Sequence, residues 1–79
     1  MTLKSELTGE IKKWATKLDN ALSTTDAIDE RGRKMLSNIE AYRLDSKHFL
    51  ERKDLIKSFE CLIWAWALLE TGKELNHLK

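Results

Sequence analysis

Nine consecutive residues near the C-terminus, Cys61 to Leu69, carry no polar side-chain group apart from the indole N–H groups of Trp64 and Trp66. A helix that is apolar on all sides must be covered on all sides. The chain has only 79 residues and therefore few other elements with which to cover it. The sequence thus predicts a helix that lies at the centre of the fold and also meets a second molecule. This pattern indicates association with another molecule, and it does not point to a particular reaction.

Composition limits the remaining choices. A chain of 79 residues makes one domain, whose core alone contributes roughly 3–5 kcal/mol of stability. Fourteen Lys and Arg against 13 Asp and Glu leave a net charge of +1, so no strong field favours nucleic acid or an anionic membrane. A single cysteine, Cys61, excludes an internal disulfide and fits a reducing compartment. The apolar run is far shorter than the roughly 20 residues of a membrane span. We therefore expect a cytoplasmic protein without a cofactor.

The periodicity of apolar residues predicts three long helices, since the chain has no proline and only three glycines. They span about residues 3–22, 26–52 and 55–72. The first apolar stripe consists of Leu3, Leu7, Ile11, Trp14, Leu18 and Ala21, and the second of Ile28, Gly32, Met35, Ile39, Tyr42, Ser46 and Phe49. The third consists of Leu55, Phe59, Leu62, Trp66 and Leu69, broadened by Ile56 and Ile63. Short connections then favour an all-α, antiparallel up-down-up three-helix bundle.

Polar clusters predict the two turns. The cluster from Ser23 to Asp26 provides capping side chains before the second helix, and Asp54 is a cap of the third. Gly32 and Ser46 are small residues within an apolar stripe, which we interpret as packing devices. The segment from Lys73 to Lys79 either continues the third helix beyond Gly72 or folds back.

The third helix leaves apolar residues outside its inner stripe. Trp64 lies about 200° from Trp66 around a helix, so the two indoles cannot face the same core. Cys61, Trp64 and Leu68 share the outer side, with Lys57 and Glu60 at its border. This make-up is typical of an interface anchor, and the expected partner is a second copy or another protein. In the alternative interpretation, Trp64 lies flat against a neighbouring helix.

The second half of the chain also carries aromatic, acidic and small residues in a recognisable order. They are Tyr42, Asp45 and Ser46, Phe49, the turn from Glu51 to Asp54, Phe59 and Glu60, and the segment from Trp64 to Gly72. This order resembles a family of small archaeal helical proteins catalogued as domain of unknown function 357. The resemblance implies a compact helical bundle and no reaction. The family pattern has glycine in place of Lys53, and lysine adopts a left-handed turn conformation only at an energetic cost.

Three pairs of residues have spacings that occur in catalytic or metal sites. Arg43 and His48 have a spacing seen in metal-independent ribonucleases, yet they diverge by roughly 140° around a helix. Asp45 with His48, and Glu74 with His77, have the spacing of metal ligands, but these pairs fall on outer or terminal positions. Asp45 is expected beside the core, bonded to an indole N–H or a turn amide. The sequence favours a non-enzymatic interaction module without a metal. The alternative is an RNA-binding or RNA-processing bundle that uses Arg43, His48 and the basic faces of the first two helices, which consist of Lys12, Lys13, Lys17, Arg31, Arg33 and Lys34.

Overall fold

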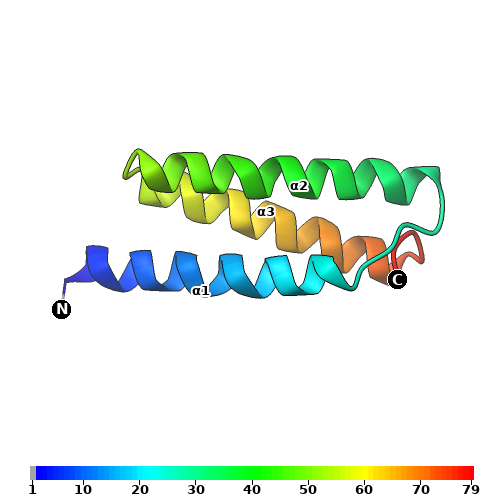
Figure 1. Ribbon diagram of the computed structural model, residues 1–79, viewed down its shortest axis with the longest axis horizontal. Helices are drawn as coiled ribbons and strands as arrows, with labels where there is room; N and C mark the ends of the chain where they lie inside the picture. Colours follow the sequence, from blue (N-terminus) through cyan, green and yellow to red (C-terminus); the bar gives the residue numbers. More distant parts are fainter. Residues whose placement is uncertain (1) are drawn as a thin grey trace.

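The computed structural model describes residues 2–79 as an antiparallel up-down-up arrangement of three helices (Figure 1). They are α1 (Leu3–Ser23), α2 (Glu30–Glu51) and α3 (Leu55–Glu74). The molecule is elongated, 43 × 18 × 17 Å, and α3 packs against both α1 and α2, which contact each other little. The all-α three-helix fold predicted from the apolar periodicity is therefore confirmed.

Each helix begins at a side chain that satisfies a free backbone N–H group. Thr2 and Ser5 form a capping box at α1, and Asp54 accepts a hydrogen bond from the amide of Lys57 at α3. At α2 the prediction was four residues too early. Asp29, not the cluster ending at Asp26, caps this helix through the amide of Gly32, because the chain between Thr24 and Asp29 pairs with the C-terminus instead.

The hydrophobic core differs from the predicted stripes on α3. Ile56 and Ile63 were expected inside, and both are exposed. The buried side of α3 instead includes the small residues Ser58, Ala65 and Gly72, which recur every seven residues. The core is formed by Ile11, Ala15, Leu18, Ile39, Leu62, Ala65, Leu69 and Leu78. Small residues allow α2 to lie close to α3, so α3 turns this side inward and Ile56 and Ile63 outward.

A buried pair of serines lies within this α2–α3 contact. Ser58 donates a hydrogen bond of 2.7 Å to the carbonyl oxygen of Ser46, and the two hydroxyls lie 3.1 Å apart. Both hydroxyls are therefore satisfied inside the apolar seam, as burial of polar groups requires. Ser46 and Gly32 are buried small residues of α2, as expected from the sequence for packing positions.

The last four residues, 76–79, fold back and form what we call the C-terminal strap. Helix α3 continues past Gly72 to Glu74, and Asn76 then reverses the chain with φ 62°. The strap pairs with the α1–α2 connection through an isolated bridge between Ala27 and Leu78. Leu78 is 2% exposed and belongs to the core. The segment that the sequence left open thus first continues the helix and then folds back.

The strap adds a titratable contact at the start of α2. The Nδ1 atom of His77 lies 2.7 Å from Oδ2 of Asp29. This hydrogen bond, followed by that from the Gly32 amide, holds the pKa of Asp29 below its usual value. A depressed carboxyl pKa contributes stability above the unfolded-state pKa and loses it as the pH falls through the folded-state pKa.

We therefore expect the Asp29–His77 contact to stabilise the protein at neutral pH and to lose its effect below about pH 4. In Asp29→Asn, which retains a helix-capping residue, the acid limb of the melting temperature against pH should be flatter than in the wild type. Thermal unfolding followed by circular dichroism between pH 2 and pH 7 measures this, with Asp26→Asn as control. Parallel acid limbs for the wild type and Asp29→Asn would contradict the assignment.

Candidate interaction surface

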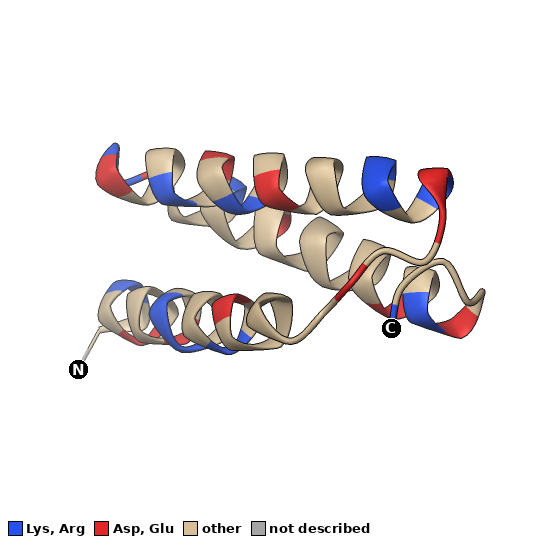
Figure 2. Cartoon of the chain, turned by 45° about the vertical axis from the view of Figure 1, so that its right-hand side comes forward, with Lys and Arg blue, Asp and Glu red and all other residues tan. Residues whose placement is uncertain are grey.

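The solvent side of α3 carries three large apolar side chains. Ile56 is 68% exposed, Ile63 53% and Trp64 59%. We call the outer face of α3 the surface formed by Ile56, Lys57, Glu60, Ile63, Trp64, Ala67 and Thr71. Figure 2 shows a long stretch of this helix without charged residues, whereas both signs of charge are interspersed along α1 and α2. Several large exposed apolar side chains on one side of a helix in a small domain are typical of a contact surface.

Of the residues predicted to form one outer patch, only Trp64 is largely exposed. Its indole stacks on the ring of Tyr42, with ring centroids 6.4 Å apart and an interplanar angle of 18°. Cys61 and Leu68 are half-buried. Helix α2 therefore covers part of the predicted patch, and the exposed apolar surface extends from Trp64 toward Ile56 and Ile63 instead.

A depression of about 390 Å³ lies between α2 and α3 beside Trp64. It is lined by Asn38, Ala41, Tyr42, Asp45, Trp64 and Leu68. Asp45 is exposed there, and within residues 2–79 the buried Nε1 of Trp66 has no hydrogen-bond partner. The bond to an indole N–H that was one of the two expectations for Asp45 is therefore wrong for Trp66. α3 turns Trp66 toward α1, where its ring meets that of Trp14 edge-on at 6.0 Å, away from Asp45 on α2.

The Cys61 thiol has the properties of a packing residue. Burial raises its pKa, and the nearby carboxylates of Asp45 and Glu60 raise it further. A thiol with a raised pKa stays protonated at neutral pH and is a weak nucleophile. Cys61 therefore contributes volume to the α2–α3 seam.

The two residues predicted to form the rim, Lys57 and Glu60, are the charged members of the outer face. The Nζ atom of Lys57 lies 4.0 Å from a carboxylate oxygen of Asp54 and 5.7 Å from the centre of the Phe49 ring. Glu60 is exposed. Both charged side chains remain in solvent, where ion pairs contribute little to the stability of the monomer.

Sequence reasoning missed the apolar surface on the α1 side of α3. A depression of about 400 Å³ is lined there by Trp14, Phe59, Leu62, Ile63, Trp66, Ala67 and Glu70. It adjoins the outer face of α3 at Ile63. The seven-residue recurrence of Ser58, Ala65 and Gly72 was the signal that could have revealed which side of α3 faces α2.

The residues considered for catalysis do not form a shared site. Arg43 is held by Asp19, with Nε and Nη2 donating hydrogen bonds of 2.8 and 3.0 Å to the two carboxylate oxygens. His48 is exposed on α2, and His77 bonds Asp29 rather than Glu74. Between residues 2 and 79, no three His, Cys, Asp or Glu side chains are grouped so that they could hold a metal ion.

Comparison with known proteins gives the family of the chain. The sequence profile of a family described as protein of unknown function, DUF357, matches residues 12–78. The chain belongs to the DUF357 family. A crystal structure of a DUF357 protein from Archaeoglobus fulgidus superimposes with a TM-score of 0.89, and the sequences are 41% identical over 99% of this chain and 97% of that chain. No curated protein matches.

The resemblance to a DUF357 pattern in the second half of the sequence is thus confirmed, and the match extends over most of the chain. The relative is archaeal and shares the helical fold. In this DUF357 protein, none of the described helices has the length and apolar character needed to cross a membrane.

Proposed function

We propose that this DUF357 protein is a non-enzymatic module that binds a second copy of itself, or another protein, through the outer face of α3. The observation that supports this is the exposure of Ile56, Ile63 and Trp64 on one side of one helix. Burying such side chains contributes about 25 cal/mol for each Å² of apolar surface removed from water. Contact with a partner would therefore be favourable.

The surroundings of these side chains also suit a contact surface. Ala67 and Thr71 lie on the same face and are small enough to let a partner helix approach. Lys57 and Glu60, the charged residues of this face, carry opposite charges and could pair with Glu60 and Lys57 of a second copy. In a two-fold dimer the outer face of α3 of one subunit packs against the outer face of α3 of the other. The same apolar side chains are then buried on both subunits.

The test is the mass of the protein in solution as a function of concentration. Sedimentation equilibrium of the wild type should give a mass above that of the monomer. The variant Ile63→Lys with Trp64→Glu should be monomeric, with the dissociation constant raised at least about tenfold because central apolar anchors dominate binding energy. Its helical content by circular dichroism should be unchanged.

The matched control is Leu44→Lys on α2, because Leu44 is 67% exposed but stands outside the outer face of α3. This variant should associate like the wild type. A wild type that stays monomeric at high concentration and captures no protein through this face would refute the proposal. Ile56→Lys provides a second variant, should the change at Trp64 disturb its stacking on Tyr42.

The alternative function remains an RNA-binding or RNA-processing bundle. It has less support because the guanidinium of Arg43 is engaged by Asp19, which leaves His48 without the expected cationic partner. That alternative would have to rely on other basic residues of the helices.

A further inference from the structure

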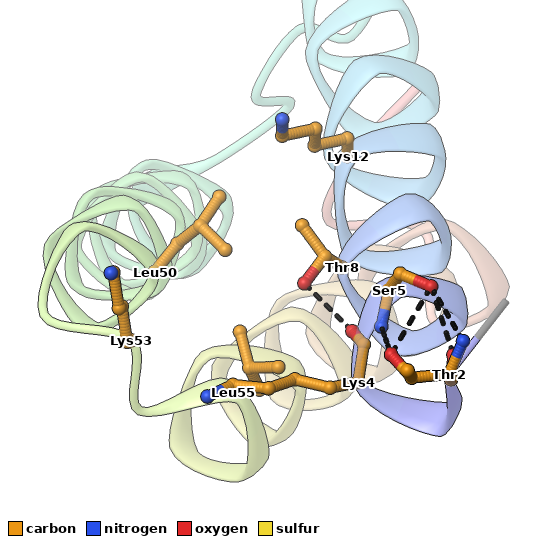
Figure 3. A pocket seen from close by; sticks show the side chains of 8 residues that line it. All are labelled: Thr2, Lys4, Ser5, Thr8, Lys12, Leu50, Lys53 and Leu55. Atoms are coloured by element: carbon orange, nitrogen blue, oxygen red, sulfur yellow. Dashed lines mark hydrogen bonds between the residues drawn. The ribbon is translucent and has the colours of Figure 1, made fainter.

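Three lysines surround a depression at the end of the molecule where α1 begins and α2 turns into α3 (Figure 3). Its volume is about 410 Å³. The lining residues are Thr2, Lys4, Ser5, Thr8, Lys12, Leu50, Lys53 and Leu55. Lys4 and Lys12 come from α1, and Lys53 comes from the α2–α3 turn on the opposite side. No carboxylate is among the lining residues, although the whole chain is nearly neutral.

These lysines are not neutralised by the ion pairs in the described part of the chain. The pairs within residues 2–79 involve Arg33, Arg43, Lys57 and His77. Asp54 follows Lys53 in sequence, but its carboxylate caps α3 and lies near Lys57. The positive ends of the α1 and α3 dipoles lie at this end of the molecule together with the negative end of α2, so the positive charge of the depression comes mainly from the lysines.

The backbone of Lys53 places this residue in the tight turn that ends α2. Its φ is 63°, in the left-handed region that glycine adopts at no steric cost and lysine does not. This conformation closes α2, because the amide of Lys53 donates to the carbonyl oxygen of Leu50 and the amide of Asp54 donates to that of Phe49, the bonding pattern of a helix end with a left-handed residue. The Lys53 side chain thereby borders the depression on the α2 side, and Lys4 and Lys12 border it on the α1 side.

The other lining groups hold the lysine-bearing segments in place, and none of them is suited to recognise a nucleobase. Thr8 donates a hydrogen bond of 2.9 Å to the carbonyl oxygen of Lys4, and Ser5 is engaged in the capping box with Thr2. These bonds hold the first turns of α1 that carry the lysines. Leu50 and Leu55 form an apolar floor, and no aromatic ring lines the depression. Recognition here would therefore depend on charge and not on the stacking of a nucleobase.

We propose that this depression binds an oligophosphate group through the ammonium groups of Lys4, Lys12 and Lys53. Lysines act as point charges on phosphate oxygens, and three of them match an anion with two or three adjacent phosphates. The same chemistry occurs in a free polyphosphate chain and in a nucleic-acid backbone. The site lies at the end of the bundle, away from Ile63 and Trp64, and it meets the outer face of α3 only where Leu55 adjoins Ile56.

The test uses the full chain and two probes, inorganic tripolyphosphate and a single-stranded oligonucleotide, at low salt. Both should bind, and amide chemical shifts should change at the first turns of α1 and at the α2–α3 turn. For the oligonucleotide, the logarithm of the binding constant should fall with the logarithm of salt concentration with a slope of about −2, as expected for three phosphate contacts. The probe that binds more tightly at equal salt identifies the source of the phosphate.

Lys53→Gly separates binding from folding. It should weaken tripolyphosphate binding about fivefold or more because one of three charges is lost, and it should raise the melting temperature because glycine relieves the left-handed strain. Lys12→Gln should weaken binding without raising the melting temperature. Lys34→Gln, on α2 outside the depression, should do neither. If neither probe binds, or if Lys34→Gln weakens binding as much as Lys53→Gly, the site does not exist.

Discussion

Replacing Leu78 by alanine is expected to lower the free energy of unfolding by about 2–4 kcal/mol, although Leu78 is the second-last residue of the chain. The side chain is 2% exposed and lies within the core of the bundle, against Gly72 of α3. Its removal leaves a cavity between α3 and the α1–α2 connection. Urea unfolding followed by circular dichroism measures the change.

The matched control for Leu78 is Leu75→Ala, because Leu75 is 59% exposed and precedes the strap. Its effect should stay within about 0.5 kcal/mol. Hydrogen exchange gives a local readout, since the amides of Asp26 and Ile28 donate to carbonyl groups of Lys79 and His77. These two amides should exchange faster in Leu78→Ala. Equal stability losses at positions 75 and 78 would show that the strap does not dock as described.

Gly32→Ala is the second substitution with a large expected effect, about 2–3 kcal/mol of destabilisation. A Cβ atom at Gly32 would overlap the backbone carbonyl oxygen of His77 and would also crowd Ala27. Backbone atoms cannot turn aside as a side chain does, so the strap has to move away from α2. Displacing it also exposes Leu78 and breaks the His77–Asp29 hydrogen bond.

Gly9→Ala is the control because it makes the same chemical change inside α1. Nothing lies within 4 Å of a Cβ atom built at Gly9. Alanine is favoured over glycine in a helix, so this variant should be more stable by about 0.5–1 kcal/mol. Chemical denaturation of both variants gives the two changes directly. Effects of the same sign at Gly9 and Gly32 would refute the close contact between α2 and the strap.

Several features of the structure could be predicted from the residue types and their spacing along the chain. The four-and-three spacing of residues such as Ile11 and Leu18 predicts helices because it places them on one side of a 3.6-residue repeat. Trp64 and Trp66 lie on different sides of α3 for the same reason. Asp54 is recognisable as a cap because its side chain can reach the free amide of Lys57 three residues later.

Other features depend on which segments pack against each other in the folded protein. Thr25 lies in the α1–α2 connection and is buried, and Asp29 rather than Asp26 begins α2, because the C-terminal strap pairs with this connection. The secondary-structure propensity of the α1–α2 connection contains no information about its pairing with the C-terminal strap, which lies some 50 residues later in the chain. The lysine cluster has the same origin, since Lys53 joins Lys4 and Lys12 only when the α2–α3 turn reaches the start of α1.

The sequence by itself determined the number and type of the helices, the direction of Trp64 and the class of the fold. Only the tertiary structure decided that Ile56 and Ile63 face solvent and that Leu78 completes the core. Helical periodicity establishes which residues lie on the same side of α3. It does not establish which apolar side packs against α1 or α2 and which side faces solvent. The buried side of α3 contains Ser58, Ala65 and Gly72, whose small size allows a neighbouring element to pack closely there. The outer face of α3 therefore stays exposed.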